Sequence, residues 1–377
     1  MKITGEQMLF YRGIRPLLFS LDPEKAHQLG IRTGSIVQSI PGVLRFIRCD
    51  PNVDPILRVA LAGIDFANPI GLAAGLDKSG EIVPAMQAIG FGHLEIGSIS
   101  ARPSKGNQTP RLWRLIDDAA VLVHYGLPND GSVVVAKRLQ DLRNRDAIKT
   151  PIGVNLVNTN EPSSAPSSPD AVIDDYRESA KRFADVTSYL MLNLSCPNTI
   201  DGRGFFEQSS RLDDLLRSVT EVTGDVPVFL KLSPDWEQTL IADLLDIALQ
   251  YRSVAGVMFN LSAHRREGLV SAPSTYQDRP GAIAGRPTKD WMDRRTAWLF
   301  RQLRGTRLRI ISAGGIQNAT DAYRRIRLGA SLVQVYTALI YHGPGLVAKI
   351  NRDLAERLRR DGVNQLSDVI GIDAMER

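Results

Sequence analysis

Eight short apolar segments recur along this chain, and the stretches between them carry helical patterns. Each segment is a near-continuous run of apolar residues, which is typical of parallel strands buried on both faces. A regular alternation of such strands with helices favours a closed barrel of β/α units. The sequence therefore predicts an α/β protein, a (β/α)8 TIM barrel, with strands at residues 69–74, 93–98, 152–157, 189–194, 228–232, 254–259, 309–313 and 332–336.

The chain contains segments in addition to the eight β/α units. Its 377 residues exceed the usual length of such a barrel. Residues 111–123, between the second and third strands, have the pattern of a β-hairpin insertion. Residues 1–45 have helical patterns and are followed by a linker that contains Pro51. We expect two parts, a small N-terminal helical extension at residues 1–45 and a barrel at residues 52–377.

The N-terminal extension has an amphipathic and basic pattern. Apolar residues such as Leu17 and Leu18 are interleaved with Arg12, Arg15 and Lys25. Such a unit either lies on a membrane surface or caps a protein core, and the pattern alone favours the cap.

Charge and cysteine content argue against several function classes. The net charge is +5, but the basic residues are scattered among acidic ones, so we expect no nucleic-acid partner. Cys49 and Cys196 are far apart and form no metal-binding or redox spacing, and the five histidines form no zinc cluster. We therefore expect neither a metal centre nor a disulfide framework.

The ends of the predicted strands collect small residues, amides and lysines. In a (β/α)8 barrel the carboxyl ends of all strands meet at one mouth, where ligands bind. Gly314 and Gly315 follow the seventh strand, and Tyr336 and Thr337 end the eighth. Because glycines allow backbone N–H groups to approach an anion, the mouth is predicted to hold a flat ligand that carries a phosphate.

Lys231 lies in the fifth strand, where a buried lysine without a function would be costly. It either forms a Schiff base or places a positive charge beside a flavin and stabilises the reduced form. Asn155 and Asn193 favour the flavin, because amides can match the edge of its ring.

Cys196 follows the fourth strand and lies between Asn193 and Asn198. A thiol between two amides suits proton abstraction beside a carbonyl, with the thiol as the base and the amides holding the substrate. A small, inert and buried cysteine is the alternative.

The motifs at the strand ends resemble those of the dihydroorotate dehydrogenase family, FMN-containing barrels of pyrimidine biosynthesis. The resemblance covers nearly the whole chain, and its specific motifs are residues 68–78, 90–92, 95–98, 102–103, 106–107, 110–112, 285–287 and 329–334. It implies that FMN is held by Ala74, Gly75, Lys78, Ser98, Asn155, Asn193, Lys231, Gly285, Gly314, Gly315, Tyr336 and Thr337. By the same resemblance the substrate, dihydroorotate or an analogue, would contact Lys78, Asn193, Asn198 and Asn260. We further expect substrate contacts from His124, Tyr125 and Gly126, which lie in a run that departs from the family pattern.

The resemblance also implies a reaction and a location. Cys196 would remove a proton from C5 of dihydroorotate, a hydride would pass from C6 to FMN, and a quinone would reoxidise the flavin. Residues 21–27 resemble the extension of the membrane-associated, quinone-using class. Residues 1–45 are then expected to contact the membrane surface, with the protein bound peripherally on its cytoplasmic side. Their removal is expected to impair quinone coupling but to spare substrate-driven flavin reduction.

The chain departs from the family pattern on the substrate side. Cys196 stands where the quinone-using class has Ser, and Val123 stands where the family has a substrate-binding Asn. Phe259 and Leu261 replace hydroxyl residues, and residues 157–160 replace a Gly-Lys-Asn-Lys run. Each lost partner of a buried polar group costs ~1–3 kcal/mol, so the departures weaken the expected binding of dihydroorotate.

Three functions are compatible with these features. The first is a dihydroorotate dehydrogenase in which His124, Tyr125 or Asn129 supplies compensating contacts. The second is a recruited FMN oxidoreductase for a different, less polar substrate, for example in secondary metabolism. The third is a non-redox, phosphate-binding barrel lyase that uses Lys231. His124 is either a new acid or ligand contact or a packing residue.

Overall fold

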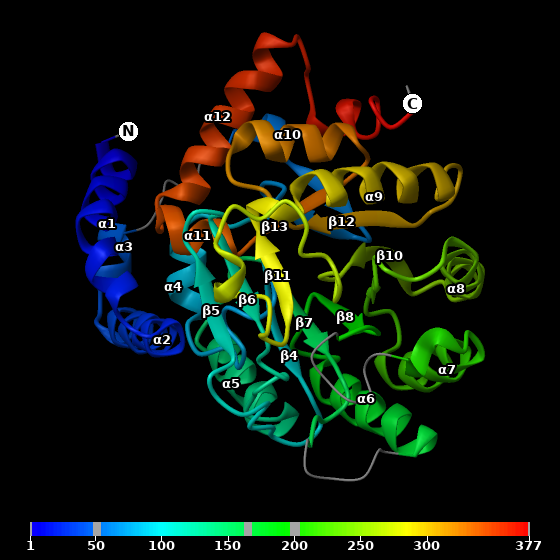
Figure 1. Cartoon of the computed structure of the whole chain (residues 1–377). Helices are drawn as coiled ribbons and strands as arrows, with labels where there is room; N and C mark the ends of the chain where they lie inside the picture. The colour runs from blue at the N-terminus through cyan, green and yellow to red at the C-terminus, as the bar shows by residue number, and fades with distance from the viewer. Residues whose placement is uncertain (1, 48–53, 162–167, 197–203, 376–377) are drawn as a thin grey trace.

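The computed structural model describes residues 2–47, 54–161, 168–196 and 204–375. Within these residues, eight parallel strands close into a barrel that is surrounded by helices (Figure 1), which confirms the predicted (β/α)8 fold. The strands follow one another around the barrel in chain order. They are β3 (Ile70–Leu72), β4 (His93–Ile99), β7 (Ile152–Leu156), β8 (Tyr189–Asn193), β9 (Val228–Leu232), β10 (Val254–Phe259), β12 (Arg309–Ala313) and β13 (Leu332–Val335).

The barrel strands lie where the apolar segments predicted them, and burial explains why. In β8, Leu190, Met191 and Leu192 are all fully buried, although neighbouring side chains point to opposite faces of the strand. One face packs inside the barrel and the other packs under the helices, so a barrel strand has no solvent-facing side.

The helices around the barrel present an apolar stripe inward. In α6, Ser168 caps the first turn by accepting a hydrogen bond from the Ala171 amide, and the buried side chains lie on one face. The barrel helices are α4 (Val83–Ala88), α5 (Ser132–Asn144), α6 (Pro169–Phe183), α7 (Ser210–Thr223), α8 (Gln238–Gln250), α9 (Lys289–Gln302), α10 (Ala319–Arg327), α11 (Thr337–His342) and α12 (Leu346–Arg360).

Two smaller sheets accompany the barrel. The hairpin β1 (Val59–Leu61) and β2 (Ile64–Phe66) lies at its amino-terminal end, where the Phe66 ring meets His93 at the start of β4. The predicted hairpin insertion is confirmed as β5 (Leu112–Leu115) and β6 (Ala120–Val123). A third strand, β11 (Ala282–Gly285), pairs with β6 and was not predicted, because its partner is distant in the chain. This sheet lies in front of the barrel in Figure 1.

The extension forms three helices, α1 (Lys2–Ser20), α2 (Pro23–Ser39) and α3 (Val43–Ile47), to one side of the barrel (Figure 1). The Tyr11 hydroxyl donates to the Ile340 carbonyl at 2.5 Å, and Gln38 donates to the Glu81 carbonyl at 2.6 Å. These bonds attach α1 to α11 and α2 to the loop before α4. In the part of the chain described, no helix combines the length and the apolar character that crossing a membrane requires.

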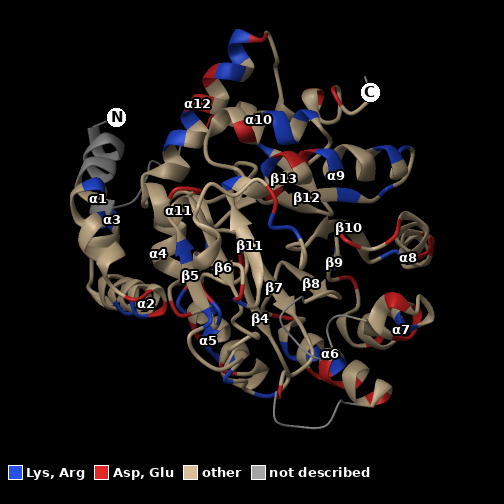
Figure 2. Ribbon diagram, in the orientation of Figure 1, with Lys and Arg blue, Asp and Glu red and all other residues tan. Residues whose placement is uncertain are grey.

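Charged side chains of both signs are intermixed along the outer helices. Figure 2 shows blue and red segments alternating on α6, α7, α9, α10 and α12 rather than a continuous basic stripe. Exposed pairs such as Arg182–Glu178 and Arg217–Asp213 link successive turns of one helix. These charges therefore form solvated helix faces.

Candidate active site

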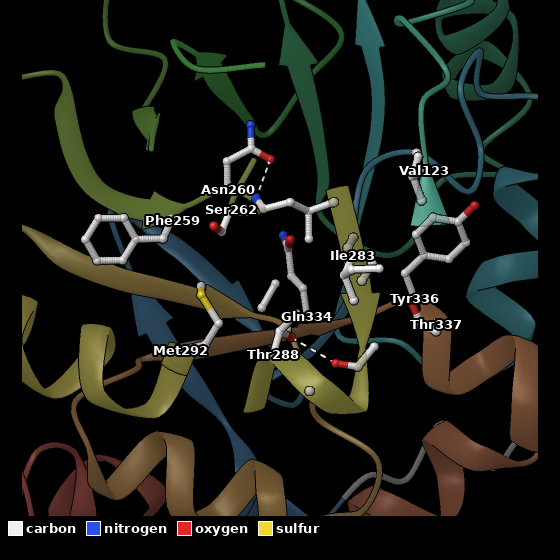
Figure 3. Close-up of a pocket in the computed structure, with 18 of the residues that line it drawn as sticks. Val123, Phe259, Asn260, Ser262, Ile283, Thr288, Met292, Gln334, Tyr336 and Thr337 are labelled. Atoms are coloured by element: carbon white, nitrogen blue, oxygen red, sulfur yellow. Dashed lines mark hydrogen bonds between the residues drawn. The ribbon is translucent and has the colours of Figure 1, made fainter. Parts of the chain in front are cut away.

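A cavity of about 270 Å³ opens at the carboxyl ends of the barrel strands. Its walls come from the ends of β3, β4, β8, β9, β10, β12 and β13 and from the β5–β6–β11 sheet. Figure 3 shows side chains from these elements converging on it, with Asn260 and Gln334 on the barrel side and Val123 and Ile283 on the sheet side. Most of the predicted site residues line this cavity, namely Ala74, Gly75, Lys78, Ser98, Tyr125, Gly126, Asn193, Cys196, Lys231, Asn260, Gly285, Gly314, Gly315, Tyr336 and Thr337.

Asn155 lies below the cavity rather than in its wall. Its side chain is fully buried, accepts a hydrogen bond from the Ser98 hydroxyl, and donates to the Glu95 carboxylate at 2.8 Å. Ser98 itself lines the cavity. Asn155 therefore acts on the site by orienting Ser98.

His124 is not among the described residues that line the cavity, and its side chain contacts Asn107. Its Nε2 lies 3.0 Å from the Asn107 side-chain amide, which also donates to the His124 carbonyl at 3.1 Å. This geometry favours the packing interpretation of His124 over the substrate-contact one. Asn198, another predicted substrate contact, lies outside the described residues.

Cys196 lies in the cavity wall just after β8 and is only 4% exposed. The chain before it is held by hydrogen bonds. The Asn260 amide donates both to the Asn193 side chain and to the Ser195 carbonyl, each at 3.0 Å, and Tyr176 donates to the Asn193 carbonyl at 2.6 Å. The thiol therefore occupies a defined position in a largely dry site.

A buried carboxylate, Glu95, organises the floor of the site. Its oxygens lie 3.6 Å from the Lys231 ammonium and 2.8 Å from the Gln334 amide nitrogen. The pairing of Lys231 with a carboxylate favours its charge-supplying role over Schiff-base formation. The sequence analysis assigned no role to Glu95 or Gln334. Both are polar residues inside an apolar strand, which is the same sequence feature that identified Lys231 as a candidate site residue.

Glycines form a close-fitting turn where the phosphate was predicted. Gly314 and Gly315 have φ values of +94° and +77°, which favour glycine, and a Cβ on Gly315 would lie 2.4 Å from the Lys289 Cα. The buried Arg325 supports this turn, because it donates to the Ala313 and Gly314 carbonyls at 3.0 and 2.9 Å. Only a bare backbone fits here, as a phosphate-binding turn requires.

The wall formed by the β5–β6–β11 sheet is apolar. Val123 and Leu261 pack against a small cluster that contains Tyr125 and Ala284. Leu127 and Ile283 extend this wall, and Arg265, Trp291 and Met292 complete the rim. Val123 and Leu261 were noted in the sequence, whereas the other residues of this wall were not predicted, because the pairing that brings β11 to β6 is not visible in local sequence.

A closed parallel barrel with a glycine-lined, polar mouth defines an enzyme of the phosphate-binding (β/α)8 class. Comparison with known proteins narrows the class. A family model described as dihydroorotate dehydrogenase matches residues 56–358. A protein of Thermobifida fusca (strain YX) named dihydroorotate dehydrogenase (quinone) is 37% identical over 97% of each chain, and one of Natronomonas pharaonis with the same name is 36% identical over 97% of this chain and 100% of its own. This chain belongs to the dihydroorotate dehydrogenase family.

Solved structures agree with this assignment. The dihydroorotate dehydrogenase of Eimeria tenella in complex with ferulenol is 29% identical and has a TM-score of 0.81, with 94% of this chain and 96% of that chain covered. A ligand-free form of the same protein has the same TM-score at 30% identity. The resemblance in the motifs is thereby confirmed, and membership of an FMN-dependent family confirms the predicted cofactor.

The cavity suits FMN in two places. The Gln334 Oε1 and the Tyr125 hydroxyl are buried in its wall and have no hydrogen-bond partner among the described residues. Buried polar atoms normally find partners, and the ring edge and ribityl hydroxyls of FMN carry both donors and acceptors. Gly314 and Gly315 line the same cavity with backbone that carries no side chain, so their N–H groups could approach the phosphate.

Proposed function

We propose that this chain oxidises dihydroorotate to orotate with FMN as cofactor and a quinone as electron acceptor, a step of pyrimidine biosynthesis. The observation that carries the proposal is one cavity that holds a thiol, two linked amides and two lysines, namely Cys196, Asn193, Asn260, Lys78 and Lys231. Family membership supports the reaction, and the names of the curated relatives support the quinone.

Each of these residues has a separate role in the proposed reaction. In its thiolate form, Cys196 takes the proton from C5, and the electrons of that C–H bond form the new C5=C6 double bond. FMN, when bound, supplies the acceptor for the hydride that leaves C6. Asn193 and Asn260 hold the polar edge of the substrate, and the Lys78 ammonium attracts its carboxylate. Lys231, paired with Glu95, places positive charge at the cavity floor beside the cofactor.

Anaerobic addition of dihydroorotate to the purified protein is expected to bleach the oxidised-flavin absorbance. The bleaching reports the cofactor, the substrate and the reductive half-reaction in a single measurement. A yellow protein that stays oxidised would contradict dihydroorotate as the substrate while leaving the fold and the cofactor assignment in place. A colourless protein that cannot be reconstituted with FMN would contradict both the substrate and the cofactor assignment.

The apolar wall supports a second candidate, an FMN oxidoreductase for a less polar substrate. Val123 and Leu261 are half-buried, pack against neighbouring apolar side chains and offer no side-chain hydrogen bond to a substrate. The Val123→Asn variant separates the two candidates, since an added amide strengthens binding of dihydroorotate and weakens binding of an apolar ring. An unchanged dissociation constant for orotate would support the first candidate, in which other contacts already hold the substrate, and a fall of about tenfold would support the second.

We also propose that the extension lies on the cytoplasmic surface of the membrane and admits the quinone there. Phe10 and Leu17 are 70% and 71% exposed and lie two turns apart on one face of α1. Leu29 and Ile36 have the same relation on α2. Exposed apolar side chains on neighbouring helices, with arginines between them, suit the boundary between lipid headgroups and acyl chains.

Replacing Phe10, Leu17 and Ile36 together by Ser is expected to reduce binding to phosphatidylglycerol vesicles by at least about tenfold, because each buried apolar side chain contributes ~1.5–3 kcal/mol. Co-sedimentation measures the loss. Val133→Ser with Val134→Ser is the control, since these residues are also exposed and apolar but lie on α5. Equal binding by the triple variant and the wild type would contradict the proposed membrane face.

A further inference from the structure

The extension reaches the wall of the active-site cavity through His27. Lys78 lines the cavity just after β3, and its Nζ lies 2.9 Å from Nε2 of His27 on α2. The turn that carries Lys78 is held by the buried Asp77, which accepts hydrogen bonds from the Glu81 and Ile82 amides. The lysine backbone is therefore fixed from the barrel side, whereas its ammonium is held from the extension side.

The chemistry of this contact assigns the roles of the two groups. In the charged form of Lys78 the ammonium has only donors, so Nε2 of His27 accepts and the ring proton lies on Nδ1. Burial and the neighbouring Lys78 charge lower the pKa of His27 well below its usual range, which keeps the imidazole neutral. A neutral imidazole with a free Nε2 lone pair is suited to hold a lysine ammonium.

His27 is itself held in place from two sides. The Lys78 ammonium lies 4.1 Å from the centre of the Tyr125 ring, and the His27 ring centre lies 6.2 Å from the same ring. One turn before His27, the Glu24 carboxylate accepts from Arg111 Nη2 at 2.7 Å and from Nε at 3.1 Å. This largely buried ion pair joins α2 to the start of β5. The position of His27 is thus set by tertiary contacts on both sides.

We propose that His27 is a positioning residue for substrate binding, whose Nε2 holds the Lys78 ammonium over Tyr125 and toward the substrate carboxylate. The extension is then part of the substrate site as well as the membrane contact. This inference rests on the proposed dihydroorotate oxidation. It replaces the expectation that removal of residues 1–45 spares flavin reduction, because that removal would take away His27 and Glu24 together.

The contribution of Lys78 to anion binding is expected to decrease as the pH rises. Burial lowers the pKa of Lys78 to about 7, while Glu24 raises it and Arg111 lowers it. The charged form attracts an anionic ligand, so binding weakens as pH rises through this pKa. Loss of the His27 acceptor favours the neutral amine and moves the weakening to lower pH. The titratable or charged groups that face Lys78 are His27 and Glu24 from α2, Arg111 and Tyr125 from the hairpin, and Asp77 and Glu81 from its own segment.

The test measures orotate binding by calorimetry from about pH 6 to about pH 9, with anaerobic flavin reduction by dihydroorotate alongside. His27→Leu removes the acceptor and is expected to raise the orotate dissociation constant about tenfold, with a smaller change in the rate at saturation. In His27→Leu, orotate binding should weaken at a lower pH than in the wild type. His27→Gln returns an acceptor near the Nε2 position and is expected to stay within about threefold of the wild type.

Gln38→Met is the matched control, because Gln38 also attaches α2 to the barrel but does not contact Lys78. It should leave both the dissociation constant and its pH dependence unchanged. The inference is overturned if His27→Leu binds orotate as the wild type does, or if His27→Leu and Gln38→Met weaken binding equally without a shift along the pH axis. A wild type that neither binds orotate nor bleaches would overturn the proposed function itself, and this inference with it.

Discussion

Replacing Cys196 by Ala is expected to slow substrate-driven flavin reduction by about 10²–10⁴-fold, the usual contribution of a positioned general base. The thiol lies in the cavity wall, is nearly inaccessible to water, and follows a segment held by Asn193 and Asn260. Water cannot easily replace it as the proton acceptor. Anaerobic stopped-flow absorbance with dihydroorotate measures the rate directly.

Two controls separate a lost base from a damaged site. Orotate affinity and FMN content should change little in Cys196→Ala, because neither depends on a proton acceptor at the sulfur. Cys196→Ser is expected to retain FMN and to reduce slowly, since a thiol has a reference pKa near ~8.5 and a hydroxyl is a far weaker acid. Reduction at the wild-type rate in both variants would remove Cys196 as the base and return it to the packing interpretation.

Replacing Glu95 by Gln is expected to destabilise the protein by about 3–5 kcal/mol, because it leaves the Lys231 ammonium in the barrel without its carboxylate. Glu95 is fully buried, and it also accepts hydrogen bonds from Asn155 and Gln334. At about 1–2 °C per kcal/mol for a chain of this length, the midpoint of thermal unfolding should fall by roughly 5 °C. Calorimetry of the FMN-loaded protein measures the change, and the flavin absorbance reports how much FMN is retained.

The neighbouring variants test the cause of this loss. Adding Lys231→Met to Glu95→Gln removes the unpaired charge and should restore much of the stability, but not the rate of flavin reduction. Glu178→Gln on α6 breaks an exposed pair with Arg182 and should change the stability by less than about 1 kcal/mol. If Glu95→Gln unfolds at the wild-type temperature, the carboxylate does not organise the barrel floor as argued.

The apolar segments predicted the barrel well because a strand buried on both faces has few alternatives. Residues 228–232, 254–259 and 309–313 were predicted as strands with the bounds that the structure has. The hairpin at residues 111–123 was also recognisable, since its two strands are close in the sequence. β11 could not be recognised in the sequence, because this four-residue strand is defined by its pairing with β6, which is far away in the chain.

The candidate site was predictable to the extent that it lies at strand ends. Gly314, Gly315, Lys231 and Cys196 could be placed at one mouth from the strand order alone. The direction in which a side chain points after the end of a strand could not be predicted from the strand order. His124 contacts Asn107 and Asn155 contacts Ser98, although the first was a possible new ligand contact and the second an FMN contact implied by the family pattern.

The sequence by itself determined the barrel, the family and the residue types at its mouth, because these follow from local apolar patterns and short motifs. Tertiary structure alone decided which of those residues share a hydrogen-bond network. Glu95 meets Lys231 and Gln334, and His27 meets Lys78, only when segments distant in the chain are packed together. The strength of such contacts depends on burial and on distances of a few ångströms, and neither is encoded in local sequence.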